Sequence, residues 1–490
     1  MTFWKNKNAG ECLKAANYLW WLPALFPLLA ILSFYIHGMW SWGLMDDVNM
    51  VGRPGTIWER FCVLFSDLFH AGRFNPTFSF HCAFFYRIFE NHPKAFFIFR
   101  WMEVVTALML WGFLAYKVTQ KKTAIPLFFA IALSFLKFYD AFFFLSTQEI
   151  LGIFFSGAAL VFFFCALKPS FIHSGNLRKT SFVTGILCLL LAFGSKEPFV
   201  SVGIALGFSL IVSWIKDRQR KDFLAVGIII FSFSVGYALF LKTFIAKGYS
   251  AGYSLTWNEI SGNIQQWFYD VLIGSHGFWI IIAVFILLGT IFSQDKKQER
   301  SVFYFWIMIF GLSVYVLYLL LILPWNAWGH YVTPLGIFFA FTLTVFLAGL
   351  LHSARTWVVG LAAVMSLGVN LYAGGKALHF HAQYQQDTQQ MLVWLSQNAL
   401  FQHEVMEAGA VVRCNANEPS GAIRKLVNNY HGQNYPKFIF TPKVGDILND
   451  PATRYYIWAP SWGDQDLRRL GNMWTPMFVS ESWIVFRRMR

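Results

Sequence analysis

Long apolar runs follow one another along most of this chain, each bounded by a short polar segment. The runs are about 20 residues long, which is the length that an α-helix needs to cross the hydrocarbon core of a membrane. Their composition does not alternate as barrel strands do, and helices satisfy their backbone hydrogen bonds internally. The pattern therefore predicts eleven membrane-spanning helices, at residues 19–40, 96–117, 124–144, 150–167, 181–195, 199–215, 223–241, 277–293, 302–323, 332–351 and 357–375.

Basic residues gather in the short segments that follow every second predicted span. Lys and Arg are enriched in the cytoplasmic loops of membrane proteins. With eleven spans all of these segments fall on one side, which predicts a cytoplasmic N-terminus and a C-terminus outside the cytoplasm. The basic segments are 117–122, 168–179, 216–222, 293–300 and 352–356.

Two long segments then lie outside the cytoplasm. The first external loop, 41–95, is too long for a plain connection, and its mixture of aromatic and polar residues predicts an amphipathic helix in the membrane interface. The tail loses the apolar runs and predicts a helix at 389–401. We therefore expect a mainly α transmembrane domain over 1–375 and a small extracytoplasmic α/β domain over 376–490. Short strands are predicted in GAVVRC, KFIFTP, RYYIWAP and WIVFRR, with a further helix in SGAIRKLVNNY.

The composition indicates a membrane protein and does not narrow the class of protein further. The chain is 57% hydrophobic and 13% charged, whereas soluble domains carry about 25% charged residues. Its net charge of +14 is explained by the basic loops, so we expect contact with membrane lipids and no nucleic acid. The six cysteines lack metal-site spacing, and Cys62 and Cys82 share one external loop, where they either pair or stay free. The first apolar run has no small-residue cleavage site and is interpreted as an anchor.

Ionisable residues recur where the predicted spans meet the external side. Such groups are expensive at membrane depth and often mark function. In the first external loop they include two adjacent carboxylates directly after the first span. The candidates are Asp46, Asp47, Arg53, Arg73, Asp140, Glu149, Lys196, Glu197, His330 and Tyr331.

Each candidate also has a structural interpretation. Lys196 and Glu197 are compatible with an ordinary solvated turn, and Tyr331 with the aromatic belt at a membrane surface. Asp140 can pair with the lysine three residues before it on one helix face. Glu149 can stabilise a helix N-terminus through its negative charge. All of the candidates fall at the external side of the predicted spans. We therefore expect them to meet in one external pocket, which favours a functional role over these separate structural roles.

The chemistry open to such a pocket is group transfer. A carboxylate can take the proton of an attacking hydroxyl group, and basic groups such as Arg53, Arg73 and Lys196 can stabilise a phosphate leaving group. No nucleotide is present outside the cell to drive synthesis. A sugar carried on a lipid phosphate is therefore the expected donor.

Five short motifs resemble those of the membrane-embedded GT-C glycosyltransferases. This superfamily includes the protein O-mannosyltransferases and the bacterial enzymes that transfer sugars or aminoarabinose from polyprenyl phosphate. The resemblance covers the whole chain as architecture, including the small tail domain. The motifs are MDD (45–47), GRFNP (72–76), STQE (146–149), SKEP (195–198) and GHYVTP (329–334).

The resemblance implies an inverting hexosyl- or pentosyltransferase of the prokaryotic inner membrane that acts in cell-envelope glycan biosynthesis. It would use a polyprenyl-phosphate sugar and a lipid, glycan or protein acceptor. Asp46 or Asp47 would be the catalytic base, with Asp46 favoured, and the other candidates would line the donor and acceptor sites. His330 stands where the family usually has Arg, so its charge depends on pH near neutrality. No cofactor is expected; a divalent metal is possible for the superfamily but is not favoured.

Two alternatives remain. A polysaccharide polymerase or ligase that uses undecaprenyl-pyrophosphate glycans typically has a large external loop late in the sequence, whereas here the largest loop between spans is the first. A lipid flippase or transporter predicts internal repeats and ionisable or broken helices at mid-membrane. The chain shows no clear repeat, and its charges gather at one face.

Overall fold

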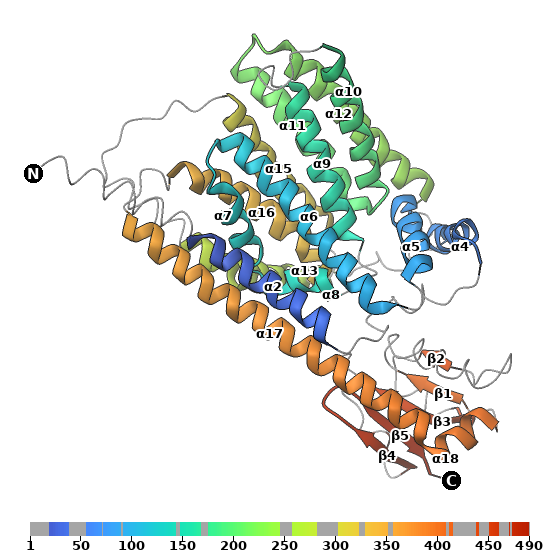
Figure 1. Cartoon of the computed structure of the whole chain (residues 1–490). Helices are drawn as coiled ribbons and strands as arrows, with labels where there is room; N and C mark the ends of the chain where they lie inside the picture. Colours follow the sequence, from blue (N-terminus) through green and yellow to red (C-terminus); the bar gives the residue numbers. More distant parts are fainter. Residues whose placement is uncertain are drawn as a thin grey trace, which may run out of the picture.

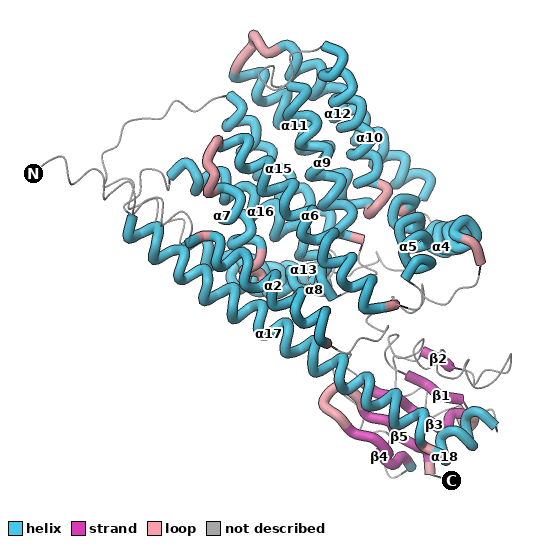
Figure 2. Tube along the Cα trace, viewed as in Figure 1, coloured by secondary structure: helices cyan, strands magenta, loops and turns pink. Residues whose placement is uncertain are grey.

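The chain forms a helical bundle with a small sheet near its C-terminus (Figures 1 and 2). The structure is a computed structural model. It describes residues 19–38, 55–70, 72–89, 92–143, 148–167, 175–245, 257–281, 302–322, 329–350, 356–407, 411–414, 438–440, 450–459, 470 and 473–489.

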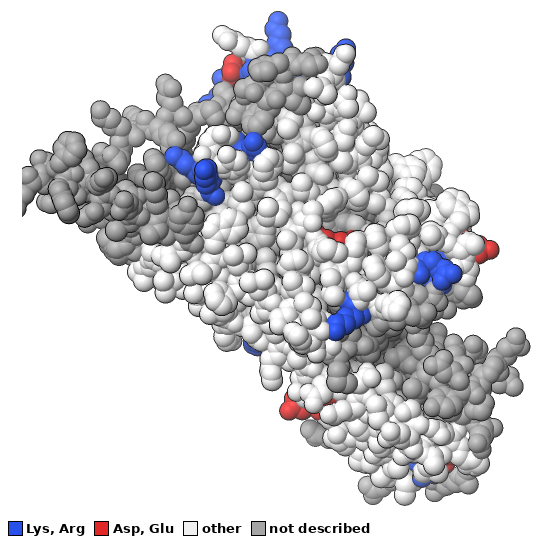
Figure 3. Space-filling view, viewed as in Figure 1, with Lys and Arg blue, Asp and Glu red and all other residues white. Residues whose placement is uncertain are grey.

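Within these ranges, seven helices are long and apolar enough to cross a membrane, which makes the chain a multi-pass membrane protein. Helices α2 (Trp21–His37) and α15 (Val302–Ile322) are also apolar, and their apolar stretches are shorter. The face of the bundle seen in Figure 3 is mostly uncharged, as a surface against lipid should be. The long helices are α6 (Pro93–Thr119), α9 (Glu149–Leu167), α10 (Gly175–Phe193), α11 (Val200–Lys216), α12 (Lys221–Phe240), α16 (Gly329–Leu350) and α17 (Thr356–Gln397).

The centre of the bundle is formed by α6, α9 and α16. The Trp111 ring on α6 packs against Phe338 and Phe341 on α16, with ring centroids 5.6 and 5.2 Å apart. Its indole nitrogen donates a hydrogen bond to the backbone oxygen of Ile153 on α9 (2.9 Å). The buried indole N–H is thus satisfied, which such a group requires away from water.

The span predicted at 124–144 is broken rather than continuous. Helix α7 (Ala124–Ala132) is followed by a 3₁₀ turn, η1 (Leu136–Tyr139), and by α8 (Asp140–Phe143), with a bend of 94°. Backbone groups at a break inside a membrane need other partners. The Tyr139 hydroxyl donates to the Leu133 oxygen (3.0 Å), and the Asn370 amide donates to the Ala130 oxygen (3.0 Å). Hydropathy does not detect the break because two of the three residues between α7 and η1, Leu133 and Phe135, are apolar.

The segment predicted as the first external loop contains two helices, α4 (Ile57–His70) and α5 (Pro76–Phe89), where one amphipathic helix was predicted. Farther along, α12 continues into the π-helix η3 (Leu241–Ile245), and α13 (Trp257–Gln266) continues into the π-helix η5 (Trp267–His276). The predicted span 277–293 is helical over 277–281, and its remainder lies outside the described residues. Cys62 is exposed and Cys82 is buried, and no disulfide bond joins the two.

Helix α17 connects the bundle to the sheet. It is one helix of 42 residues, so residues 375 and 376, the expected domain boundary, both lie inside it. Its last turns continue into the short helix α18 (Ala399–Phe401) and the π-helix η6 (Gln402–Glu407). The sheet packs on the C-terminal part of α17, where the Trp483 indole donates to Thr388 (2.8 Å) and the Ser482 N–H to Asp387 (2.8 Å).

The sheet has the strand order β2-β1-β3-β5-β4. Strands β1, β2 and β3 are parallel, and β5 runs antiparallel to both β3 and β4. Four of the strands match predicted segments; β4 was not predicted, and its Pro476 is tolerated because β4 is an edge strand. The helix predicted at 420–430 lies outside the described residues. The strands are β1 (Val411–Cys414), β2 (Phe438–Phe440), β3 (Thr453–Trp458), β4 (Trp474–Val479) and β5 (Ile484–Arg488).

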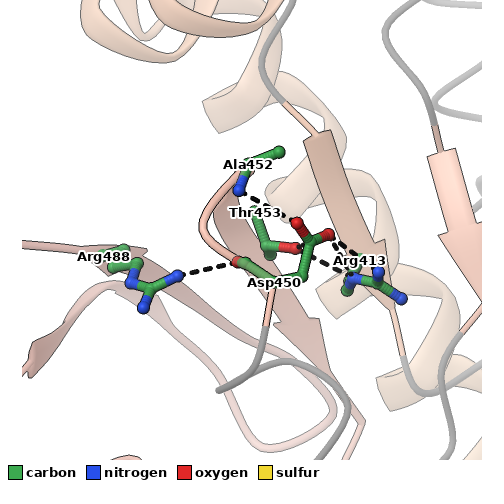
Figure 4. A network of polar contacts seen from close by, with 5 residues as sticks. All are labelled: Arg413, Asp450, Ala452, Thr453 and Arg488. Carbon is green, nitrogen blue, oxygen red and sulfur yellow. Dashed lines mark hydrogen bonds and ion pairs between the residues drawn. The ribbon is translucent and has the colours of Figure 1, made fainter.

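A polar network fastens one end of this sheet (Figure 4). The Asp450 carboxylate accepts hydrogen bonds from Arg413 on β1 (2.8 Å), from the Thr453 hydroxyl on β3 (2.8 Å) and from the Ala452 N–H (2.9 Å). Arg488 on β5 donates to the Asp450 backbone oxygen (2.7 Å). These contacts hold the pKa of Asp450 below its ordinary value, chiefly through the hydrogen bond from Arg413.

Candidate functional site

A buried ion pair joins the start of α9 to the turn after α10. Glu149 is the first residue of α9, and Lys196 lies between α10 and the 3₁₀ turn η2 (Glu197–Phe199). The Lys196 ammonium donates to the Glu149 carboxylate, and the two residues are 6% and 1% exposed. A charge this deeply buried is tolerated because it is paired.

Tyr331 covers the same ammonium group from another helix. Its ring centroid lies 4.1 Å from the Lys196 nitrogen, which is a cation–π distance, and Tyr331 lies in the first turn of α16. Burial lowers the pKa of Lys196 below its ordinary value, and the charge of Arg73 adds to this effect. The carboxylates of Glu149 and Glu197 oppose it.

The GRFNP loop is tied to the turn that carries Lys196. Gly72 has φ = 78°, a conformation that favours glycine, and it turns the chain at the end of α4. The Phe74 N–H donates to the Glu197 carboxylate (3.2 Å), and the Thr77 N–H donates to the Gly194 oxygen (2.9 Å). The fully buried Asn75 bonds to Gln148 through its amide (2.9 Å). Two motifs more than 100 residues apart therefore form one rigid wall.

This wall borders a cavity of about 300 Å³. One part of the lining is charged, with three cations and one carboxylate among its described residues: Arg73, Lys196, Lys242 and Glu197. The other part is largely aliphatic and comes from η3, α11, α12 and α15: Val200, Ala238, Leu241, Ile245, Leu321 and Ile322. A cavity of this kind suits a molecule with an anionic head and an apolar tail.

The cavity lies at the end of the helices that faces away from a basic turn. Helix α11 begins beside the cavity at Val200 and ends at Lys216, where the turn 217–220 follows. If that turn is cytoplasmic, as its charge predicts, the cavity opens toward the other side.

The structure gathers half of the predicted site residues. Arg73, Lys196, Glu197 and Tyr331 line the cavity, and Glu149 holds Lys196 from behind. Asp46, Asp47 and Arg53 lie outside the described residues, and His330 is described only as a backbone position in α16.

Asp140 is placed elsewhere, and the expectation that it shares the pocket is not supported. Its carboxylate lies 3.9 Å from the His381 ring nitrogen on α17, and it is not part of the cavity lining. Lys137, the lysine that was considered as a partner for it, forms an ion pair with Asp270 (3.5 Å) and also attracts the Asp140 carboxylate electrostatically. The 94° break after α7 explains the difference, because it redirects this segment away from the line of α7.

Lys242 and a second buried cluster were not predicted from the sequence. Lys242 follows the apolar run of α12, where a lysine usually only reaches toward water. The cluster joins His81 on α5 to Glu103 on α6 (2.5 Å), with Arg100 3.4 Å from the same carboxylate. Arg100 and Glu103 inside a predicted span were the available signal.

Among the residues that the structure describes, no group of three His, Cys, Asp or Glu side chains could hold a metal ion. The adjacent carboxylates Asp46 and Asp47 lie outside that part of the chain.

The fold and the cavity define a multi-pass membrane protein with an amphiphilic binding site. No family model matches the sequence, and no curated protein does. The crystal structure of ArnT from Cupriavidus metallidurans bound to undecaprenyl phosphate aligns with 97% of this chain and 97% of its own, at 10% identity and a TM-score of 0.49. The apo crystal structure of ArnT aligns over 98% of each chain at 10% identity, with a TM-score of 0.36. At 10% sequence identity and these TM-scores, the likeness is limited to the general course of the chain.

Proposed function

We propose that this protein is a GT-C-type membrane glycosyltransferase that moves a sugar from a polyprenyl-phosphate carrier to a hydroxyl group of an acceptor. The acceptor is a lipid, a polysaccharide or a protein. The reaction takes place on the outer face of a prokaryotic inner membrane, with the N-terminus in the cytoplasm and the sheet outside it.

The observation that carries this proposal is that one cavity is lined both by cationic side chains and by aliphatic ones. Arg73 and Lys242 supply positive charge for a phosphate group, and Lys196 stays charged through its pair with Glu149. Leu241, Ile245 and their neighbours supply a surface for an isoprenoid chain. A sugar phosphate without a lipid chain has no apolar part that could pack against these aliphatic side chains.

In the proposed reaction, the acceptor oxygen attacks the anomeric carbon of the donor sugar. Asp46 or Asp47 takes the hydroxyl proton as the general base. The bond between the anomeric carbon and the phosphate oxygen breaks, and the carrier phosphate leaves with the electron pair. Direct displacement inverts the configuration at the anomeric carbon. The cations of the cavity stabilise the leaving phosphate, so the proposal requires no metal.

The test is release of the carrier. The purified protein in lipid nanodiscs is incubated with a panel of polyprenyl-phosphate sugars and an envelope lipid and glycan extract, and free polyprenyl phosphate is measured by mass spectrometry. We expect release with at least one donor and a loss of about 10- to 100-fold in Arg73→Ala, because a charged hydrogen-bond donor is removed. Lys122→Ala, in the basic turn after α6, is the matched control and should keep full activity.

The same assay separates the alternatives. Release of polyprenyl pyrophosphate from pyrophosphate-linked glycans would identify a polymerase or ligase. Movement of the intact lipid-linked sugar across the bilayer, without cleavage, would identify a transporter. Either result, or no release with any donor of the panel, overturns the proposal.

A further inference from the structure

A second cavity lies along α17, beside the sheet. It has a volume of about 550 Å³, within the range of ligand sites, and one wall is a stripe of glutamines at helical spacing. Residues spaced three and four apart share one face of a helix, so the stripe runs for about 18 Å from 385 to 397. Its members are Gln385, Gln386, Gln389, Gln390 and Gln397.

We call this cavity the glutamine groove, and two aromatic rings also line it. Phe34 of α2 and Trp394 of α17 both line it. Trp394 is held by the tail domain, since its ring centroid lies 5.9 Å from that of Phe478 on β4. The groove therefore lies where the membrane bundle meets the sheet.

The groove carries no charge. Its described lining residues are all neutral. Asp387 is the only charged residue between 382 and 397 in the sequence, and its two oxygens are engaged by Gln383 (3.0 Å) and by the Ser482 N–H (2.8 Å). A merely solvated helix face is usually rich in Lys and Glu, which favour both solubility and helix formation. A row of glutamines without charges indicates a different requirement.

We infer that the glutamine groove binds the neutral glycan part of the acceptor. An amide side chain offers two donor hydrogens and an acceptor oxygen, which matches hydroxyl groups that both donate and accept. Aromatic rings such as those of Phe34 and Trp394 cover the apolar faces of sugar rings. None of the described lining residues is a cation, so they offer no charged partner to a phosphate or an anionic lipid headgroup.

This inference deepens the proposed function, on which the role of the glycan as acceptor rests. Binding itself is independent of transfer and is measured without a donor. The probes are three neutral tetrasaccharides, built of glucose, of mannose and of N-acetylglucosamine. Saturation-transfer NMR with the full-length protein in nanodiscs gives the dissociation constant of each.

The diagnostic variant is Gln386→Ala/Gln390→Ala, because both side chains are exposed and their loss leaves the core of the helix intact. We expect at least one tetrasaccharide to bind and the double variant to weaken binding roughly tenfold or more, since each lost neutral hydrogen bond contributes about a factor of several. Gln219→Ala, an exposed glutamine in the basic turn before α12, is the matched control and should bind as the wild type does.

Two results overturn the inference: no binding of any of the three probes, or equal binding by the wild type and the double variant. Glycan binding through the groove without carrier release from any donor would instead end the proposed function alone. Where transfer is observed, the double variant should raise the KM for the acceptor and leave kcat unchanged. A fall in kcat with unchanged KM would contradict the groove as an acceptor site.

Discussion

The Lys196 ammonium is buried between two side chains: it forms an ion pair with Glu149, and the Tyr331 ring centroid lies 4.1 Å away. This contact joins the start of α9 and the first turn of α16 to the turn between α10 and η2. The pair therefore has two roles, because it fixes the helix ends and keeps a cation beside the cavity.

Breaking this pair from one side should destabilise the protein more than replacing both partners. Lys196→Met leaves the Glu149 carboxylate buried without its cation, at a cost of about 3–5 kcal/mol. Lys196→Met/Glu149→Gln removes both charges and should recover most of that loss. Thermal unfolding in detergent measures the difference, and an equal melting temperature for the two variants would contradict it. Both variants should be impaired in transfer.

Neutralising the catalytic carboxylate should abolish transfer without unfolding the protein. One of Asp46→Asn and Asp47→Asn is expected to lower the rate by about 10²- to 10⁴-fold, the usual contribution of a general base. Asp67→Asn, an exposed aspartate on α4 in the same external loop, is the control and should stay active. Full activity in both single variants would remove these residues from the mechanism.

The rate of transfer should fall on the alkaline side at a pH below the ordinary lysine value. Because burial lowers the pKa of Lys196, this side chain loses its proton at a lower pH than an exposed lysine, and the positive charge beside the cavity is lost. In Lys196→Arg the guanidinium keeps its proton throughout. The transfer rate of Lys196→Arg should therefore begin to fall at a higher pH than that of the wild type, which a pH–rate profile of each protein measures. An alkaline fall at the same pH in both proteins would exclude Lys196 as its origin.

Acid should weaken the tail domain through Asp450. The pKa of this carboxylate is lowered in the folded state, mainly by the hydrogen bond from Arg413, so its contribution is complete above the unfolded-state pKa and lost as the pH falls through the folded-state pKa. Pepsin should cleave the tail of Asp450→Asn faster than the tail of the wild type near pH 5, and the two cleavage rates should be equal near pH 2. A difference in cleavage rate that persists near pH 2 would contradict this linkage.

The close contact of α11 and α12 should not tolerate a methyl group at Gly207. A Cβ there would lie 2.6 Å from the Phe231 backbone nitrogen, and backbone cannot move aside as a side chain can. We expect Gly207→Ala to cost about 1–3 kcal/mol, the usual cost of overpacking. Gly236→Ala on α12 has no atom within 4 Å of the new Cβ and should be neutral or slightly stabilising. Thermal unfolding of the two variants compares them, and equal stability would show that the helices separate.

The sequence alone determined the class of the molecule and most of its helices. Lipid requires long apolar helices, so spans such as α9 and α11 are visible in the sequence without any knowledge of their neighbours. The strands β1, β3 and β5 were also predictable, because β-branched and aromatic residues fit a half-buried pleated surface. The charges of Arg73, Lys196 and Glu197 made them candidates from the sequence, and the structure places all three on one cavity.

Tertiary structure alone decided which of these charges meet. Asp140 follows the break after α7 and lies beside His381 of α17, outside the cavity lining, so residues that look equivalent in the sequence have different surroundings. Lys242 and the glutamine groove are likewise defined by facing elements. Hydropathy depends on each residue and its near neighbours, whereas a site depends on contacts between segments far apart in the chain, and these are set by packing.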